Sequence, residues 1–191
     1  MIARHYVATG TVLIATGCVA ALAGSSWGSP SGSVDTTGPP PARIAVENCR
    51  TSPGWGRRDD LTRRTSLVVG PVAIRNARPV LAYAPTVSGN KVILSVRGGH
   101  RVTLEVPPAA REDAAIGFGV TQDGDWTSAP RAVRFIACRR GERTGQFDGW
   151  PITSWVGFLF ASSPRCVPLL VWVDDEPNAR RAVLRFGVTS C

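Results

Sequence analysis

Short apolar stretches separated by turn residues are the feature that most constrains the fold of this chain. Residues 91–106 (KVILSVRGGHRVTLEV) show the pattern best, because β-branched residues and leucine alternate with polar residues on both sides of Gly98-Gly99. A period of two places the apolar residues on one face of a strand. No window of the sequence shows a sustained apolar stripe with the 3.6-residue period of a helix. The chain is therefore predicted to be built from strands.

The two halves of residues 91–106 predict a β-hairpin. With the turn centred on Gly99, three apolar pairs would face each other: Val96 with Val102, Leu94 with Leu104, and Val92 with Val106. A register one residue away would place Val96 opposite Arg101 and mix buried with solvated side chains on one face. We therefore expect a three-residue or five-residue hairpin loop in which glycine supplies the positive φ angle.

Six further segments have the composition of strands: 66–75, 114–120, 132–138, 155–161, 167–173 and 182–188. The acidic turn 174–179 separates the last two segments, and their apolar alternation continues across it, so we expect them to pair. Residues 107–115 admit one helical turn after their prolines. Short strands at this spacing predict an all-β fold, an antiparallel β-sandwich of immunoglobulin-like or jelly-roll-like type.

Four cysteines follow residue 43: Cys49, Cys138, Cys166 and Cys191. In an oxidising compartment they most economically form two disulfides, for which three pairings exist. We favour Cys49 with Cys138 and Cys166 with Cys191, because the second bond would tie the last residue to the strand segment that it follows. No C-x-x-C spacing occurs, so a zinc site is not predicted. No other metal ligand set and no cofactor are predicted.

The N-terminal segment predicts export. Residues 6–23 carry no charged side chain, and the small-x-small pattern of Ala21 and Ala23 favours cleavage after Ala23 as a signal peptide. Two alternatives stay open. Cys18 follows a lipobox-like Ala-Thr-Gly and is a candidate for lipidation, and the apolar run could be retained as a membrane anchor in a slightly thinned bilayer. All three possibilities, namely cleavage, lipidation and a retained anchor, place the rest of the chain outside the cytoplasmic membrane. It is then either extracellular or tethered to the outer face of that membrane.

The composition predicts three parts. Residues 1–23 are the signal peptide or anchor helix. Residues 24–43 are rich in Gly, Ser, Thr and Pro and cannot bury enough apolar surface to order themselves, so we expect a disordered, flexible linker. Residues 44–191 have the length of one ordinary domain with its own core.

The charge indicates an anionic partner. The formal net charge is +8, and every basic residue except Lys91 is arginine. The doublets Arg57-Arg58 and Arg139-Arg140 are candidate anion-binding residues, because guanidinium groups form bidentate hydrogen bonds to carboxylates and phosphates. An anionic polymer of the cell envelope or lipid head groups are the expected partners. Solubility combined with a general bias toward arginine is the alternative explanation. Nucleic acid is not expected, since no nucleic-acid-binding motif accompanies the charge.

Tryptophans in turn-rich segments provide a second functional signal. Trp55, Trp126 and Trp150 lie in such segments, where the sequence pattern does not assign them to the core. They are candidates for stacking on carbohydrate rings. The alternative is that they cap the open ends of a sandwich and bury apolar area there.

No catalytic residue is predicted. His100 is the one histidine after the leader, and we expect it to be a solvated turn residue, because no nucleophile and no orienting carboxylate are marked beside it. The acidic turns 123–125 and 174–176 would suit calcium, yet each lacks further ligands at fixed offsets. Asp123 and Asp125 would be the acid and base of a secreted hydrolase, which stays open as an alternative function, as does a protease inhibitor.

The cysteine-bearing strands resemble a group of small exported or lipid-anchored all-β proteins of high-GC Gram-positive bacteria. The similarity lies in AVRFIAC, GFLFASSPRCVPLLVWV and RRAVLRFGVTSC, which cover about the last third of the chain. The resemblance implies export and disulfide bonding, and it brings no activity and no catalytic residue. Together, these observations predict an exported, noncatalytic envelope-associated binding or structural module.

Overall fold

The computed structural model describes residues 44–54, 60–78, 80–81, 89–118, 129–144, 147–148 and 150–191. This part of the chain is all-β, with two five-stranded sheets, a two-stranded sheet and two short 3-10 turns. None of the helical turns in these residues has the length and hydropathy of a membrane span. The predicted signal or anchor segment with Cys18, and the predicted linker, lie outside the described residues.

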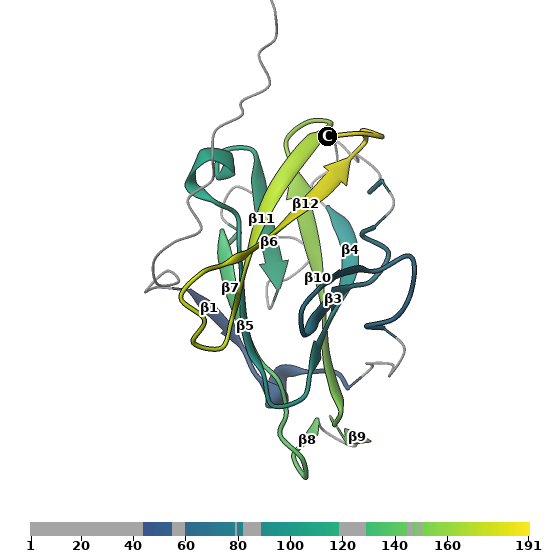
Figure 1. The fold of residues 1–191 in the computed structure, drawn as a ribbon, viewed down its shortest axis with the longest axis vertical. Helices are drawn as coiled ribbons and strands as arrows, with labels where there is room; N and C mark the ends of the chain where they lie inside the picture. The colour runs from purple at the N-terminus through teal and green to yellow at the C-terminus, as the bar shows by residue number, and fades with distance from the viewer. Residues whose placement is uncertain are drawn as a thin grey trace, which may run out of the picture. The chain divides into compact units, whose positions relative to one another are not determined.

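The two large sheets are drawn in Figure 1. The first sheet has the strand order β1 (Ala45–Glu47), β7 (Ala132–Ile136), β5 (Arg101–Glu105), β11 (Arg165–Val173) and β12 (Arg180–Phe186). The second has the order β2 (Leu67–Val69), β3 (Val72–Ile74), β4 (Asn90–Arg97), β10 (Ile152–Ala161) and β6 (Ala114–Phe118). A small sheet pairs β8 (Arg143–Thr144) with β9 (Phe147–Asp148). Within these sheets, neighbouring strands are antiparallel except β1 and β7, which are parallel.

Each of the six further segments predicted to be strands overlaps at least one strand. Residues 66–75 form the β2–β3 hairpin, and 155–161 form most of β10. The last two segments form β11 and β12, which pair across the acidic turn as expected. The predicted helical turn is the 3-10 turn η2 (Pro108–Ala110). These predictions are confirmed. They succeed because each depends on local alternation and turn chemistry.

The predicted hairpin over residues 91–106 is wrong. Its two halves form β4 and β5, which belong to different sheets, so the glycine turn crosses from one sheet to the other. The N–H of Gly98 donates to the carbonyl of Pro151 at 2.7 Å, and the N–H of Gly99 donates to the carbonyl of Cys138 at 2.9 Å. The need for positive φ is met, since Gly99 has a φ of 84°.

The reason for the error is that alternation reports which face is buried and not which strand supplies the hydrogen bonds. All six apolar residues assigned to the hairpin are buried in one core cluster, as predicted: Val92, Leu94, Val96, Val102, Leu104 and Val106. Three of them come from the second sheet and the others from β5 of the first sheet and the residue after it.

One hydrophobic cluster draws on both large sheets and forms the centre of the core. Phe135 of β7 lies 4.9 Å from Phe118 of β6 and 5.2 Å from Trp155 of β10, measured between ring centroids. Burying a large apolar side chain completely is worth about 1.5–3 kcal/mol. Aromatic residues from opposite sheets therefore contribute strongly to holding the sheets together.

Both disulfides of the favoured pairing are present. Cys49–Cys138 joins the 3-10 turn η1 (Cys49–Thr51) to the segment after β7, and Cys166–Cys191 joins β11 to the last residue. Disulfides form and persist in oxidising compartments. The two bonds therefore indicate an oxidising, extracellular-type environment.

A buried polar network anchors the segment before β2 to the second sheet. Asp60 is fully buried and accepts hydrogen bonds from the guanidinium of Arg75 at 2.8 Å and the hydroxyl of Ser95 at 2.7 Å. Ser95 of β4 also lies 2.7 Å, oxygen to oxygen, from the hydroxyl of Ser154 of β10. A buried charge is tolerated only when it is paired and hydrogen-bonded, and Asp60 satisfies both conditions.

Candidate functional site

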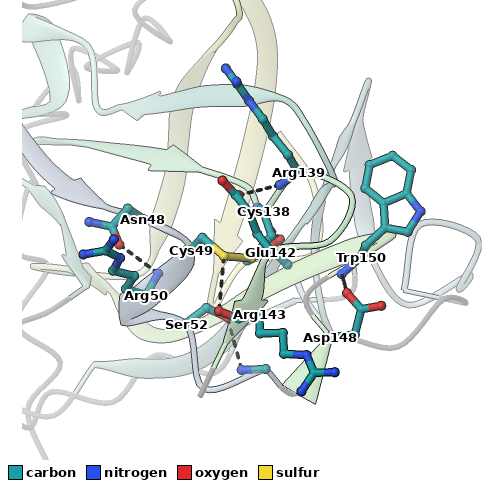
Figure 2. The surroundings of a disulfide bond; sticks show 12 residues. Asn48, Cys49, Arg50, Ser52, Cys138, Arg139, Glu142, Arg143, Asp148 and Trp150 are labelled. Atoms are coloured by element: carbon teal, nitrogen blue, oxygen red, sulfur yellow. Dashed lines mark hydrogen bonds between the residues drawn. A yellow bond between two sulfur atoms is a disulfide. The ribbon is translucent and has the colours of Figure 1, made fainter. Parts of the chain in front are cut away.

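The Cys49–Cys138 disulfide brings together loops that are far apart in the sequence (Figure 2). On one side, Asn48 caps the turn η1 by accepting the N–H of Arg50 on its side-chain oxygen at 2.9 Å. On the other side, the N–H of Cys138 donates to the hydroxyl of Thr153 in β10 at 2.8 Å. These bonds fix the backbone on both sides of the sulfur atoms, so the residues next to each cysteine have defined positions.

A tight turn follows Cys138 and presents an arginine doublet. The N–H of Arg139 donates to a carboxylate oxygen of Glu142 at 2.7 Å, and the N–H of Glu142 donates back to the carbonyl of Arg139 at 3.0 Å. Gly141 has a φ of 87°, a conformation that glycine adopts readily. The turn exposes both Arg139 and Arg140 to solvent.

Trp150 lies against the glycine turn that crosses between the sheets. A Cβ atom built on Gly98 would be 2.3 Å from Cε3 of Trp150 and 3.0 Å from the carbonyl oxygen of Cys138. The indole therefore covers Gly98 directly, at a place where no side chain would fit. The N–H of the Trp150 backbone donates to the carboxylate of Asp148 at 3.0 Å. The indole packs against Gly98, and Trp150 remains 39% exposed.

The other two described tryptophans are buried and hydrogen-bonded. Trp155 donates its indole N–H to the carbonyl of Asn48 at 3.1 Å, and Trp172 donates to the carboxylate of Glu105 at 2.9 Å. They are 2% and 5% exposed. The indole N–H of Trp150 has no hydrogen-bond partner among the described residues. In the described part of the chain, Trp150 thus differs from both in being exposed and in having an available donor.

We call the residues around this disulfide the disulfide surface: Arg50, Arg97, Arg139, Arg140, Arg143 and Trp150. All six are exposed. Figure 2 shows four of these side chains extending away from the sulfur atoms: Arg50, Arg139, Arg143 and Trp150. Arg97 immediately precedes Gly98, on which the indole of Trp150 rests.

The five arginines of the disulfide surface have no carboxylate within 4.0 Å among the residues that the structure describes. Elsewhere the guanidinium groups are commonly paired: Arg75 with Asp60, Arg111 with Glu105, Arg165 with Asp113, and Arg180 with Glu176. The positive charge of the disulfide surface is therefore not neutralised by ion pairs within the described structure. That arrangement suits an external anion.

A metal ion does not fit the same place. The sulfur atoms of Cys49 and Cys138 and a carboxylate oxygen of Glu142 lie within 4.8 Å of one another. The two sulfur atoms are joined in a disulfide, however, and metals bind the thiolate form of cysteine. Only Glu142 of this group is left as a ligand.

His100 has an acidic partner that the sequence analysis did not anticipate. Its Nδ1 atom lies 2.8 Å from a carboxylate oxygen of Asp174, whose other oxygen accepts the backbone N–H of Arg101 at 2.9 Å. Partial burial raises the pKa of Asp174. The hydrogen bonds from the Arg101 N–H and from His100, with the positive charges nearby, together lower the pKa by more than burial raises it, so it lies below its usual value. The histidine is thereby oriented. Within the described residues, its second ring nitrogen contacts no nucleophile.

The structure brings three sequence-predicted residues together: Arg139, Arg140 and Trp150. The other candidates lie outside the described residues: Arg57, Arg58, Trp55, Trp126, Asp123 and Asp125. Arg50, Arg97 and Arg143 were not predicted, because a search for doublets overlooks single arginines. One signal was available. Arg50 follows Cys49 and Arg139 follows Cys138, so the favoured disulfide pairing already implied that these two arginines are neighbours.

Comparison with protein-family models, with curated proteins and with solved structures found no match for this chain.

Proposed function

We propose that this protein is an exported, noncatalytic binding module that attaches to an anionic polymer of the cell envelope through the disulfide surface. The proposed fold for this role is a β-sandwich, for which the shared core of the two large sheets is the support. The observation that carries the proposal is the group of exposed arginines without acidic partners around Cys49–Cys138.

A polymer suits these arginines better than a single small anion. An exposed ion pair contributes only about 0.2–1 kcal/mol, so one contact holds a ligand weakly. A chain of repeated carboxylates or phosphates engages several guanidiniums at once, and the later contacts form at high effective concentration. Binding of this kind weakens as salt is added, because the Debye length falls from about 10 Å at 0.1 M to about 3 Å at 1 M.

The test is the double substitution Arg139→Gln and Arg140→Gln. Its matched control is Arg64→Gln with Arg181→Gln, which removes the same charge from exposed arginines on other elements. Retention is measured on cell-wall preparations with and without their anionic polymers, and on phosphatidylglycerol vesicles against phosphatidylcholine vesicles. We expect the first variant to weaken retention on the anionic wall about 2-fold to 30-fold, from two lost ion pairs, and the control to change it little.

Equal retention of both variants would reject this surface as the binding site. Preference for phosphatidylglycerol vesicles over the anionic wall would assign the arginines to lipid head groups instead.

Export is supported by the two disulfides, which require oxidising conditions, and by the N-terminal sequence pattern. The intact mass of the protein recovered from an exporting host tests it. A chain starting at Gly24 indicates a released domain, and a chain starting at an acylated Cys18 or at Met1 indicates a tethered one. Recovery of full-length protein with reduced cysteines from the cytoplasm would contradict export.

A secreted hydrolase is the second candidate, favoured by one observation. Asp174 orients His100 as a carboxylate orients the base of a catalytic triad, which would let His100 activate a water molecule. Release of reducing ends or acyl groups from envelope polymers, abolished by His100→Asn, would support hydrolysis. Retention on the wall without any turnover favours the noncatalytic function.

A further inference from the structure

Trp150 adds to the arginines a feature that simple charge attraction does not need. Trp150 is exposed, whereas the other exposed large apolar side chains among the residues whose burial is described are valines and an isoleucine. The Cε3 and Cζ3 atoms of its indole lie against Gly98, and its backbone N–H is bound to Asp148, so the backbone and the packed edge of the ring have defined positions. An aromatic ring packed along one edge offers a large contact area at a low cost in conformational entropy.

Two unpaired arginines are attached to the backbone that touches this ring. Arg97 directly precedes Gly98, and Arg139 directly follows Cys138, whose carbonyl oxygen lies 3.0 Å from the point above Gly98 that the ring covers. The backbone here is fixed by the bond from the Gly99 N–H to the Cys138 carbonyl at 2.9 Å. The indole and the backbone that carries these two arginines therefore meet in one small part of the disulfide surface.

From this juxtaposition we propose that Trp150, Arg97 and Arg139 form a subsite for an acidic sugar unit, so that the polymer bound is an acidic polysaccharide. This inference rests on the proposed function. The apolar face of the sugar ring stacks on the indole, and the carboxylate of the sugar accepts paired hydrogen bonds from guanidinium groups. The free indole N–H donates to a sugar hydroxyl. A polyphosphate chain satisfies the arginines but has no ring to stack on Trp150.

The experiment compares three probes at one salt concentration by isothermal titration calorimetry: hexagalacturonate, a neutral galactose oligomer, and linear polyphosphate of similar charge. We expect hexagalacturonate to bind at least about tenfold more tightly than either of the others. Trp150→Ala should weaken hexagalacturonate about tenfold and polyphosphate less than about twofold, while Trp150→Phe keeps most of the sugar affinity. Circular dichroism checks that each variant keeps the wild-type fold.

A matched pair on one strand tests the arginine part. Arg97 and Lys91 lie on the same face of β4, six residues apart, which separates them by about 20 Å. Arg97→Gln should weaken hexagalacturonate by about threefold, and Lys91→Gln should leave it unchanged.

The outcomes separate this inference from the proposed function. If polyphosphate binds through Arg139 and Arg140 but Trp150→Ala has the same effect on both charged probes, the sugar subsite is rejected and the anionic binding function stands. If no charged probe depends on Arg139 and Arg140, both are rejected.

Discussion

The two disulfides should stabilise the domain by different amounts, because they close chain segments of different length. Cys49–Cys138 spans 89 residues and Cys166–Cys191 spans 25. In the chain-entropy description, a cross-link stabilises by restricting the unfolded chain, and the effect grows with the logarithm of the loop length. The two loops correspond to about 4.6 and about 3.5 kcal/mol of unfolding free energy at 25 °C.

The perturbation is replacement of each pair by alanine, C49A/C138A in one variant and C166A/C191A in the other. Cys138 is fully buried, so its replacement also removes core contacts and adds to the first value. The segments 49–138 and 166–191 do not overlap, so the two losses should be nearly additive. A variant without both bonds would lose about 8 kcal/mol, which is within the whole stability range of about 5–15 kcal/mol for ordinary proteins.

Urea unfolding followed by tryptophan fluorescence measures the free energy of unfolding of each variant. We expect C49A/C138A to be less stable than C166A/C191A by at least about 1 kcal/mol. A larger loss for C166A/C191A would refute the reasoning from loop length. It would show that local packing around the C-terminal residue outweighs the restriction of the unfolded chain.

Two further predictions concern acidic residues. Asp60→Ala leaves the guanidinium of Arg75 without its buried partner and should lower the free energy of unfolding by about 3–5 kcal/mol. The control Asp175→Ala, at a side chain 93% exposed, should change the free energy of unfolding by less than about 0.5 kcal/mol. Similar small losses for both variants in urea titrations would contradict the role of Asp60. Asp174→Asn tests the lowered pKa of Asp174. Because the pKa is lower in the folded state, the ionised Asp174 stabilises the fold above the unfolded-state pKa of about 3.9, and this stabilisation is lost as the pH falls through the folded-state pKa. Because this side chain is 43% exposed, the difference from wild type should stay below about 1 kcal/mol at pH 7 and vanish in melting curves recorded at the most acidic pH; a difference that grows on acidification would refute it.

Sequence reasoning identified the strands well and their partners less well. The segments that became β6, β7, β10, β11 and β12 were visible because their alternation is a local property. The parallel pairing of β1 with β7 was not visible, since a three-residue edge strand carries almost no pattern of its own. Its position depends on a strand more than eighty residues away.

The candidate site was predictable to a smaller extent. Arg139, Arg140 and Trp150 drew attention because of their neighbours in the sequence, whereas Arg50, Arg97 and Arg143 acquire a role only when their loops converge. The partnership of His100 with Asp174 likewise joins residues 74 positions apart. No local pattern records such a distance.

What the sequence determined by itself is the set of residues that face the core and the chemistry available outside it: alternating strands, cysteines able to pair, and an excess of arginine. The apolar residues of 91–106 were correctly placed in the interior, but the division of β4 and β5 between two sheets depends on long-range packing. The physical reason is that side-chain burial depends on a residue's own strand, while backbone hydrogen bonds and the gathering of charges depend on which distant segments meet.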